Sequence, residues 1–236
     1  MIRLFVQNKL SLNTSFSPSE KQQHYLIHVM RQKAGDSVLC FNGRDGEWLC
    51  RIKQLGKRQI ELLVEDQTQI QTTREFCALC PAIIKKDPMD LVLQKATELG
   101  VSDIYPLITD HTVVKNFNMD RARAIIEEAA EQSERLDVPT LHNPVCVTDL
   151  NQNLPKECAC CYLSEREYNL PQKELKNPIA FLVGPEGGWS KEEVAFFKKH
   201  PKFSGVHFVG GILRAETAAI TALSCWQIGR FIKWKK

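Results

Sequence analysis

The pattern of hydrophobic and polar residues changes about a third of the way along the chain. The first 72 residues contain four short runs rich in β-branched and aromatic side chains, IRLFV, SVLCF, EWLCRIKQL and QIELLVE, which predict strands. The turn-forming pairs Asn42-Gly43 and Asp45-Gly46 separate two of these runs. Several short strands of this kind are typical of a small β-barrel.

One helix is expected inside this β-rich region, over residues 18–31, opened by Ser17 or Ser19. The polar stretch 65–74 (EDQTQIQTTR) has no apolar period and is interpreted as a linker. The sequence therefore predicts a first domain over residues 1–72 and a second over residues 73–236.

After the linker, strand and helix patterns alternate. The apolar runs FCALCPAII, VSDIYPLI, CACCYL, IAFLVG and GVHFVG predict strands, several of them buried on both faces. Helices are expected from Asp87 to Gly100, with Leu91, Ala96 and Leu99 facing inward, and over residues 119–135, 190–200 and 216–228. The Ser190 helix opens with a capping box that ends at Glu193. This alternation predicts an α/β domain with a mostly parallel sheet.

Composition narrows the class of protein. The 236 residues fit one large or two modest domains, and no run of about 18 apolar residues predicts a membrane span. We see no signal peptide, so the nine cysteines are expected to be reduced thiols in a cytoplasm. The net charge of +3 arises in the first 72 residues, which hold ten Lys or Arg against seven Asp or Glu. This surplus gives weak support for phosphate contact there, and a mixed solvated surface explains it equally well.

The densest chemical signal is the sequence FLVGPEGGWS, residues 181–190. A buried strand ends at Val183, five residues rich in glycine follow, and a capped helix begins. Glycines at the carboxyl end of a parallel strand allow a ligand to approach the main chain closely. A plain strand-to-helix turn is the alternative, although it needs fewer glycines.

A second corner of the same kind follows the last predicted strand, in FVGGILRAETA, residues 208–218. Neither corner has the spacing of a dinucleotide fingerprint or a phosphate-binding loop. A small ligand held largely by main-chain groups is therefore expected, provided that the two corners meet across one pocket.

Six short motifs in chain order resemble the 16S ribosomal RNA uracil-N3 methyltransferases, a family of the knotted SPOUT class. They are His28–Arg31 with Gly35-Asp36, Phe41–Gly43, KKDPMDLVLQKATELG (85–100), EAAEQSER (128–135) before Pro139, GPEGGWS (184–190) and ILRAETA (212–218). Together they cover nearly the whole chain.

The resemblance implies properties that composition and periodicity do not show. They are a PUA-like RNA-binding N-terminal domain, a C-terminal trefoil knot, S-adenosylmethionine (SAM) as methyl donor bound in the loops of the knot, and a homodimer. The implied substrate is 16S rRNA in the small ribosomal subunit, methylated on N3 of uridine 1498 in rRNA numbering. No metal and no membrane are implied, and the location is cytoplasmic.

Carried over by position, the resemblance implies a set of donor-binding residues: Leu163, near Ser164, from a third loop, Gly184, Glu186, Gly187 and Gly188 from the first corner, and Gly210, Ile212 and Leu213 from the second. The second corner departs from the family pattern, because Val209 and Gly211 stand where the family has Gly and Arg, and Ala215 stands where it has Thr. Glu134 likewise replaces the usual Gly.

Arg214 and Glu216 are the candidate catalytic residues. Uracil N3 must lose its proton before or during methyl transfer, and a cation can stabilise the developing imide anion. Arg214 suits that role, but a dimer-interface or phosphate-binding arginine is an equal alternative. Glu216 is expected to orient Arg214, to cap the last helix or to take the proton.

Candidate RNA-binding residues are His28, Arg31, Lys85, Lys86, Gln132 and Arg135. Solvated surface positions explain the first four equally well. Residues 131 and 135 share a face of a helix, so a simple intrahelical pair between Glu131 and Arg135 is a further alternative.

Three other functions stay open. Cys77, Cys80, Cys158, Cys160 and Cys161 suggest a zinc site, but the second cluster lacks CxxC spacing and both lie on predicted buried strands, so small core side chains explain them better. A non-catalytic RNA-binding protein has no need of two glycine-rich strand ends. An enzyme of the same class acting on a ribose 2′-hydroxyl or another base differs only in its substrate.

Overall fold

The computed structural model describes residues 1–55, 59–114, 116–164, 178–208 and 211–231. The chain folds into two compact units, one formed by Met1–Thr73 and Ala130–Val138 and the other by Arg74–Ala129 and Pro139–Lys236. The sequence division at residue 72 did not anticipate that segment 130–138 folds with the first unit.

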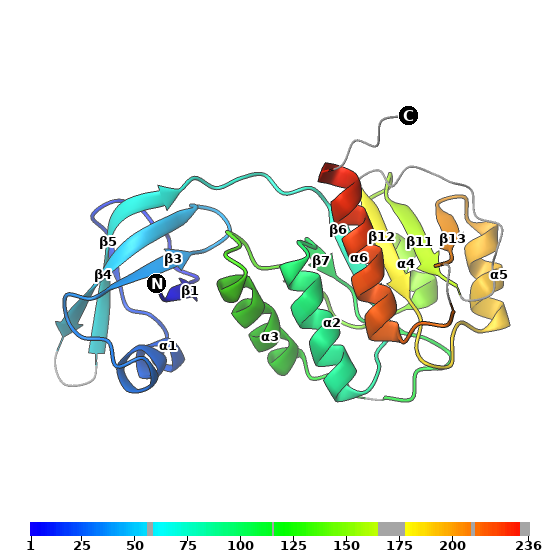
Figure 1. The fold of residues 1–236 in the computed structure, drawn as a ribbon, viewed down its shortest axis with the longest axis horizontal. Coiled ribbons are helices and arrows are strands. Elements are labelled where there is room, and N and C mark those ends of the chain that lie inside the picture. The colour runs from blue at the N-terminus through cyan, green and yellow to red at the C-terminus, as the bar shows by residue number, and fades with distance from the viewer. Residues whose placement is uncertain (56–58, 115, 165–177, 209–210, 232–236) are drawn as a thin grey trace. The chain divides into compact units, whose positions relative to one another are not determined.

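The first unit is built on a five-stranded mixed sheet (Figure 1). The strands are β1 (Arg3–Phe5), β2 (Ser15–Phe16), β3 (Ser37–Phe41), β4 (Glu47–Leu55) and β5 (Gln59–Gln69), in the order β1-β3-β4-β5-β2. All pairs are antiparallel except β1 with β3. Gly43 and Gly46, both at positive φ, make the turn between β3 and β4, as the turn pairs predict.

The predicted linker is wrong over half its length. β5 continues to Gln69, and Gln69 is paired with Glu47 on β4. Pairing with a long neighbouring strand satisfies the main chain there, so the polar side chains of this stretch simply face outward.

The predicted helix is observed as α1 (Glu20–His24), which continues into the π-helical turn η1 (Tyr25–Val29). Of the two proposed N-caps the structure selects Ser19, whose hydroxyl accepts from the N–H of Gln22 in a capping box. Leu26 buries its side chain against the sheet, where it joins the apolar core of this unit.

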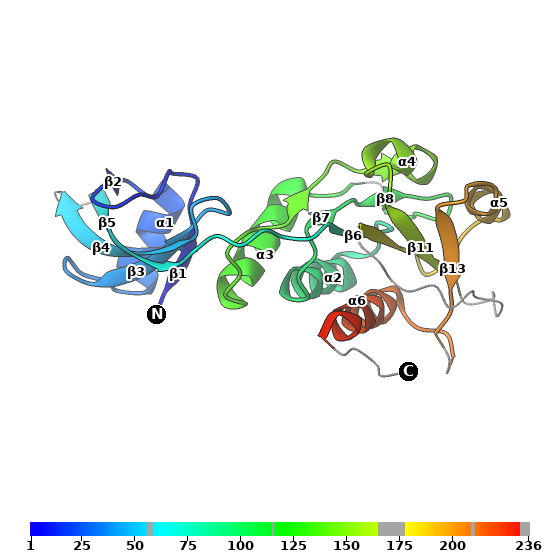
Figure 2. The same cartoon turned by 90° about the horizontal axis from the view of Figure 1, so that it is seen from above.

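The second unit contains a six-stranded sheet in which every pair is parallel (Figures 1 and 2). Its strands are β6 (Cys77–Pro81), β7 (Asp103–Ile104), β9 (Thr140–Leu141), β11 (Ala159–Leu163), β12 (Ile179–Val183) and β13 (Phe203–Val206), in the order β13-β11-β12-β6-β7-β9. The α/β class with a parallel sheet is thus confirmed.

Two strand predictions need correction. The run VSDIYPLI is two short strands, β7 and β8 (Leu107–Ile108), because Pro106 lacks the N–H that a continuous ladder needs. The strand expected in GVHFVG, residues 205–210, is observed as β13, which covers residues 203–206. The sequence pattern also missed β10 (Val145–Cys146), which pairs with β8, and the adjoining helical turns η2 (Val147–Asp149) and α4 (Leu150–Asn153), all shorter than five residues.

Helices cover both faces of the sheet. In Figure 2, α2 (Lys86–Glu98) and α6 (Ala215–Phe231) lie on one face, and α4 and α5 (Lys191–Lys199) on the other, while α3 (Met119–Gln132) lies beside α2. Met89, Val92, Leu93 and Ala96 are the buried apolar side chains of α2, so the expectation for Leu91, which is exposed, was wrong by one position. Within the described residues, no helix is long and apolar enough to span a bilayer.

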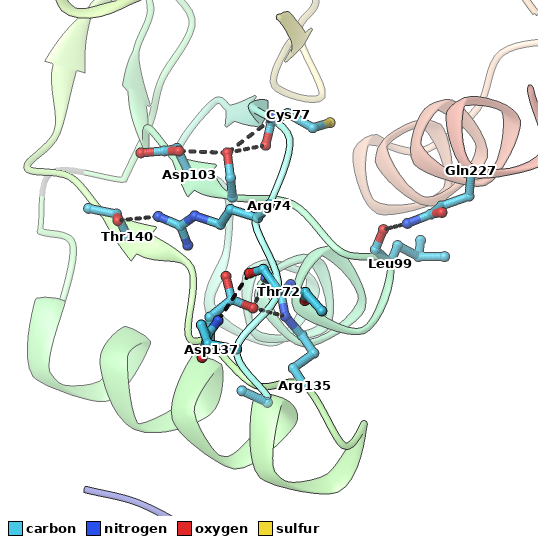
Figure 3. A network of polar contacts seen from close by, with 12 residues as sticks. Thr72, Arg74, Cys77, Leu99, Asp103, Arg135, Asp137, Thr140 and Gln227 are labelled. Atoms are coloured by element: carbon cyan, nitrogen blue, oxygen red, sulfur yellow. Dashed lines mark hydrogen bonds and ion pairs between the residues drawn. The ribbon is translucent and has the colours of Figure 1, made fainter. Parts of the chain in front are cut away.

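A polar network fixes the amino ends of β6 and β7. Asp103 accepts hydrogen bonds from the hydroxyl of Ser102 at 2.6 Å and from Nε2 of His142 at 2.8 Å, and Ser102 also accepts from the N–H of Cys77. Figure 3 shows Asp103 and Cys77 from this group, with Arg74 reaching Thr140, the first residue of β9. Burial alone would raise the pKa of the Asp103 carboxyl, but the hydrogen bonds from His142 and Ser102 outweigh it and lower that pKa.

This lowered pKa predicts an acid-dependent contribution to stability. The stabilisation from Asp103 is complete above the unfolded-state pKa of about 3.9 and is lost as the pH falls through the lower folded-state value. We expect Asp103→Asn to reduce the unfolding free energy by about 1–2 kcal/mol at pH 7 and by much less near pH 3. Urea unfolding across this range measures the difference. Asp120→Asn, at a fully exposed ion pair, is the control and should change little at any pH.

Candidate functional site

The candidate site lies at the carboxyl ends of three neighbouring strands. β11 pairs with β12 on one side and with β13 on the other, all in parallel, so Leu163, Val183 and Val206 end at the same edge of the sheet. The two glycine-rich corners that follow β12 and β13 therefore start only two strand spacings apart, about 10 Å. This is the edge at which open parallel sheets bind ligands.

The first corner is a tight turn with an exposed tip. The N–H of Gly188 donates to the carbonyl of Pro185 at 2.8 Å, and Gly188 has a φ of +68°, which disfavours any other residue. Glu186 and Gly187 are exposed. A Cβ built on Gly188 would meet no atom of the described chain within 4 Å, so its main chain is open to a ligand.

Trp189 joins this corner to the end of β11. Its indole Nε1 donates to the carbonyl of Leu163 at 2.8 Å, and its ring lies so close to Gly184 that a Cβ there would meet Cε2 at 3.1 Å. On the other side of β11, Nδ1 of His207 lies 3.0 Å from the carbonyl of Ser164. These contacts tie together the three strand ends from which the predicted donor residues come.

The second corner is described only in part, since Val209 and Gly210 lie outside the described residues. Gly211 has a φ of +127° and is exposed, as is Ile212, whereas Leu213 is half-buried. Gly211 thus occupies a conformation that suits glycine, at the position where the resembled family has Arg.

Arg214 and Glu216 lie at the start of α6. The carbonyl of Arg214 accepts the first helical hydrogen bond, from the N–H of Ala218 at 2.8 Å, and Glu216 lies in the first turn. Among the described residues neither side chain forms an ion pair or a side-chain hydrogen bond, and Arg214 is exposed. The guanidinium is therefore available to a substrate at this edge.

The six predicted RNA-binding residues are divided between the units. In the first unit His28 and Arg31 are exposed, next to the exposed His24, whose ring lies 4.8 Å from that of His28. In the second unit Lys85 and Lys86 are exposed at the start of α2, which follows the carboxyl end of β6 and so adjoins the edge with the glycine corners.

Gln132 and Arg135 have different surroundings. Gln132 is exposed, but the side chain of Arg135 is 11% exposed and binds Asp137 at 3.1 Å. Arg135 does not share a helix with Glu131, because α3 ends at Gln132, and a carboxylate oxygen of Glu131 accepts from the N–H of Phe5. The RNA contacts of all six residues stay predictions.

The cysteines that suggested zinc lie mostly inside the sheet. Cys77 and Cys80 are buried on β6, and Cys160 and Cys161 are buried on β11, with β12 between them. Burial raises the pKa of the Cys80 thiol well above its ordinary value. Within the described ranges, no group of three or more His, Cys, Asp or Glu side chains is arranged to hold a metal ion.

The site suits a small ligand that is recognised through the main chain. Gly188 and Gly211, both with left-handed φ, present open backbone, and Glu186 is an exposed carboxylate beside them in the first corner. The sequence did not predict two residues that contact this site. Trp189 donates to the carbonyl of Leu163, and Nδ1 of His111 lies 3.0 Å from the carbonyls of Gly187 and Gly188. No local signal in the sequence connects His111 with a corner 76 residues away.

A substitution of Trp189 tests whether its hydrogen bond to the end of β11 contributes to SAM binding. Trp189→Phe keeps an aromatic ring against Gly184 but removes the hydrogen bond to Leu163, so the corner becomes less well ordered. We expect the dissociation constant for SAM to rise about fivefold, equivalent to a hydrogen bond of about 1 kcal/mol. Isothermal titration calorimetry measures this. Trp48→Phe, on β4 of the first unit, should leave the constant unchanged.

Comparison with known proteins identifies the kind of domain. A family model described as RNA methyltransferase domain matches residues 73–227, and a model described as RNA methyltransferase PUA domain matches residues 18–65. The ribosomal RNA small subunit methyltransferase E of Rickettsia conorii is 32% identical over 232 residues, covering 94% of this chain and 93% of that protein.

Two solved structures are similar over almost their whole length. The ribosomal RNA small subunit methyltransferase E of Neisseria gonorrhoeae, bound to S-adenosyl methionine, is 26% identical with a TM-score of 0.87, covering 96% of this chain and 97% of that one. A putative methyltransferase from Legionella pneumophila, in complex with SAM, is 29% identical with a TM-score of 0.86, covering 96% of each chain.

Proposed function

This chain belongs to the RNA methyltransferase family, and from that premise we propose that it methylates N3 of a uridine in 16S rRNA, uridine 1498 in rRNA numbering. The enzyme is a SAM-dependent RNA methyltransferase with an α/β catalytic domain and an N-terminal PUA-like domain. One observation carries the proposal: two glycine-rich corners lie at the carboxyl ends of strands that flank β11.

The proposed donor pocket is lined by the three strand ends. When bound, SAM supplies an electrophilic methyl group on a sulfonium. The exposed turn at Glu186, Gly187 and Gly188 allows SAM to approach closely, while Leu163, Ile212 and Leu213 contact the apolar surface of the adenosine. Gly184 leaves room for the ring of Trp189. Gly210 and Glu186 complete the proposed set.

The proposed chemistry at the uracil needs a cation at the edge of this pocket. Loss of the N3 proton leaves negative charge on the imide, and Arg214 stabilises that charge as it develops. Glu216, in the first turn of α6, orients the guanidinium or accepts the proton. The pocket contributes alignment, because N3, the methyl carbon and sulfur must lie in line.

Four exposed basic residues and the exposed amide of Gln132 support an RNA substrate. His28 and Arg31 on the PUA-like domain, Lys85 and Lys86 beside the glycine corners, and Gln132 and Arg135 after α3 are the proposed contacts, of which Arg135 has the least exposed side chain. We further propose a homodimer, a trefoil knot formed by the C-terminal part of the chain, and action on the small ribosomal subunit in the cytoplasm.

A methyl-transfer assay tests the proposal. Purified protein is incubated with radiolabelled SAM and either assembled small subunits or naked 16S rRNA from cells that lack the modification, and the product nucleoside is identified by mass spectrometry. We expect 3-methyluridine at one position. A 2′-O-methylated nucleoside or another methylated base would replace the uracil assignment, and SAM binding without transfer to either substrate would contradict it.

A further inference from the structure

A short segment after β8 reaches across to the first glycine corner. Residues 109–112 form a turn in which the N–H of Thr109 donates to the hydroxyl of Thr112 at 2.9 Å. The turn directs His111 at the corner, where its Nδ1 lies 3.0 Å from the carbonyl oxygens of both Gly187 and Gly188. Carbonyl oxygens only accept, so Nδ1 carries the proton and donates to both.

Asp110, the residue before His111, contacts the other end of the glycine corner, at Ser190. A carboxylate oxygen of Asp110 accepts a short hydrogen bond from the hydroxyl of Ser190, the N-cap of α5. The N–H of Asp110 donates to Glu193 at 3.0 Å, and the second oxygen of that carboxylate accepts from the N–H of Ser190 at 2.8 Å. Glu193 is only 5% exposed, so one buried carboxylate joins the two segments.

These contacts fix the orientation of the corner's peptide groups. Gly187 and Gly188 have little intrinsic preference for one conformation, so an unsupported loop would sample many. The carbonyl of Gly187 is held by His111, and the N–H on the other side of that peptide plane is held by Pro185. The carbonyl of Gly188 fixes the next plane in the same way. A ligand that fits against this turn binds more tightly when the turn already has its bound shape.

We propose that Asp110 and His111 are positioning residues that hold the loop 184–190 in its SAM-binding shape before the ligand arrives. The inference rests on the proposed function, since it assigns these residues to the same donor pocket. Both side chains are exposed, so their removal costs the fold little, while the loop that they hold loses its order.

A set of single variants tests the role of His111. His111→Ala is expected to raise the dissociation constant for SAM about tenfold in calorimetric titration. His111→Asn should restore most of the affinity, because the amide nitrogen of Asn is as far from Cβ as Nδ1 of His is. His111→Gln places its nitrogen one bond further out and should not. The melting temperature of the ligand-free variants should stay within about 2 °C of that of the wild type.

Asp110 and a control complete the set. Asp110→Ala should weaken SAM binding about threefold, while Asp110→Asn keeps an acceptor oxygen for Ser190 and should bind normally. His200→Ala is the matched control, because His200 makes the same kind of contact, from Nδ1 to the carbonyl of Phe196, at the opposite end of α5. It should leave the dissociation constant unchanged.

The outcomes separate this inference from the proposed function. If the wild type does not bind SAM, the proposed function fails. If the wild type binds SAM and His111→Ala binds equally well, the positioning role is wrong. Equal losses in His111→Ala and His111→Asn, or a loss of affinity that follows a large fall in melting temperature, would also overturn it.

Discussion

Arg214→Ala is expected to lower the rate of methyl transfer about 100-fold while changing the dissociation constant for SAM less than twofold. Removing one preoriented donor from a site of developing negative charge typically costs about 10²–10³ in rate. Arg214 meets the structural requirement, since it is exposed at the start of α6 and, among the described residues, is not paired with a carboxylate. Arg214→Lys keeps the positive charge but not the planar guanidinium, so it should retain part of the rate.

The measurement must distinguish catalysis from RNA binding, because a phosphate contact was the equal alternative for Arg214. Single-turnover transfer at saturating RNA and SAM isolates the chemical step. A defect that disappears at high RNA concentration would assign Arg214 to a phosphate and contradict the catalytic role. Arg123→Ala, an exposed arginine on α3 paired with Asp120, is the control and should react at the normal rate.

The glycine corners were predictable because their signal is local. A buried strand, a run of glycines and a capping box lie in consecutive residues, and the structure contains both hydrogen bonds of the Ser190–Glu193 box. That the two corners start at the same edge of the sheet followed only from strand order. The alternating pattern predicted parallel strands but did not give their order, in which β11 lies between β12 and β13.

The pattern of hydrophobic and polar residues could not predict contacts between distant parts of the chain. β5 extends through polar residues because β4 is long enough to pair with them, and His111 and Trp189 act on loops whose positions depend on the sheet. The end of α3 shows the same limit. Glu134 has a φ of +58°, a conformation that favours Gly, so the helix stops before Arg135 and positions 131 and 135 do not share a helical face.

The largest expected change in stability concerns Arg3, which no sequence pattern singled out. Its Nε lies 2.6 Å from a carboxylate oxygen of Glu47, and the two side chains are only 6% and 4% exposed. Its guanidinium nitrogens donate to the carbonyls of Ala130, Glu131 and Arg135, at the end of α3 and just beyond it. The same group lies 4.5 Å from the ring centroid of Phe41.

Arg3→Ala is therefore expected to reduce the free energy of unfolding by about 3–5 kcal/mol, because it leaves the buried Glu47 carboxylate without its cation and removes the hydrogen bonds to the three carbonyls. Arg3→Lys keeps the charge but not the planar guanidinium, and should reduce the free energy of unfolding less than Arg3→Ala does. Arg51→Ala is the matched control: its pair with Glu65 has the same 2.6 Å separation but is 46% and 24% exposed, so we expect a much smaller loss. Urea unfolding followed by circular dichroism compares the three, and equal losses for Arg3→Ala and Arg51→Ala would show that burial does not set the strength of these pairs.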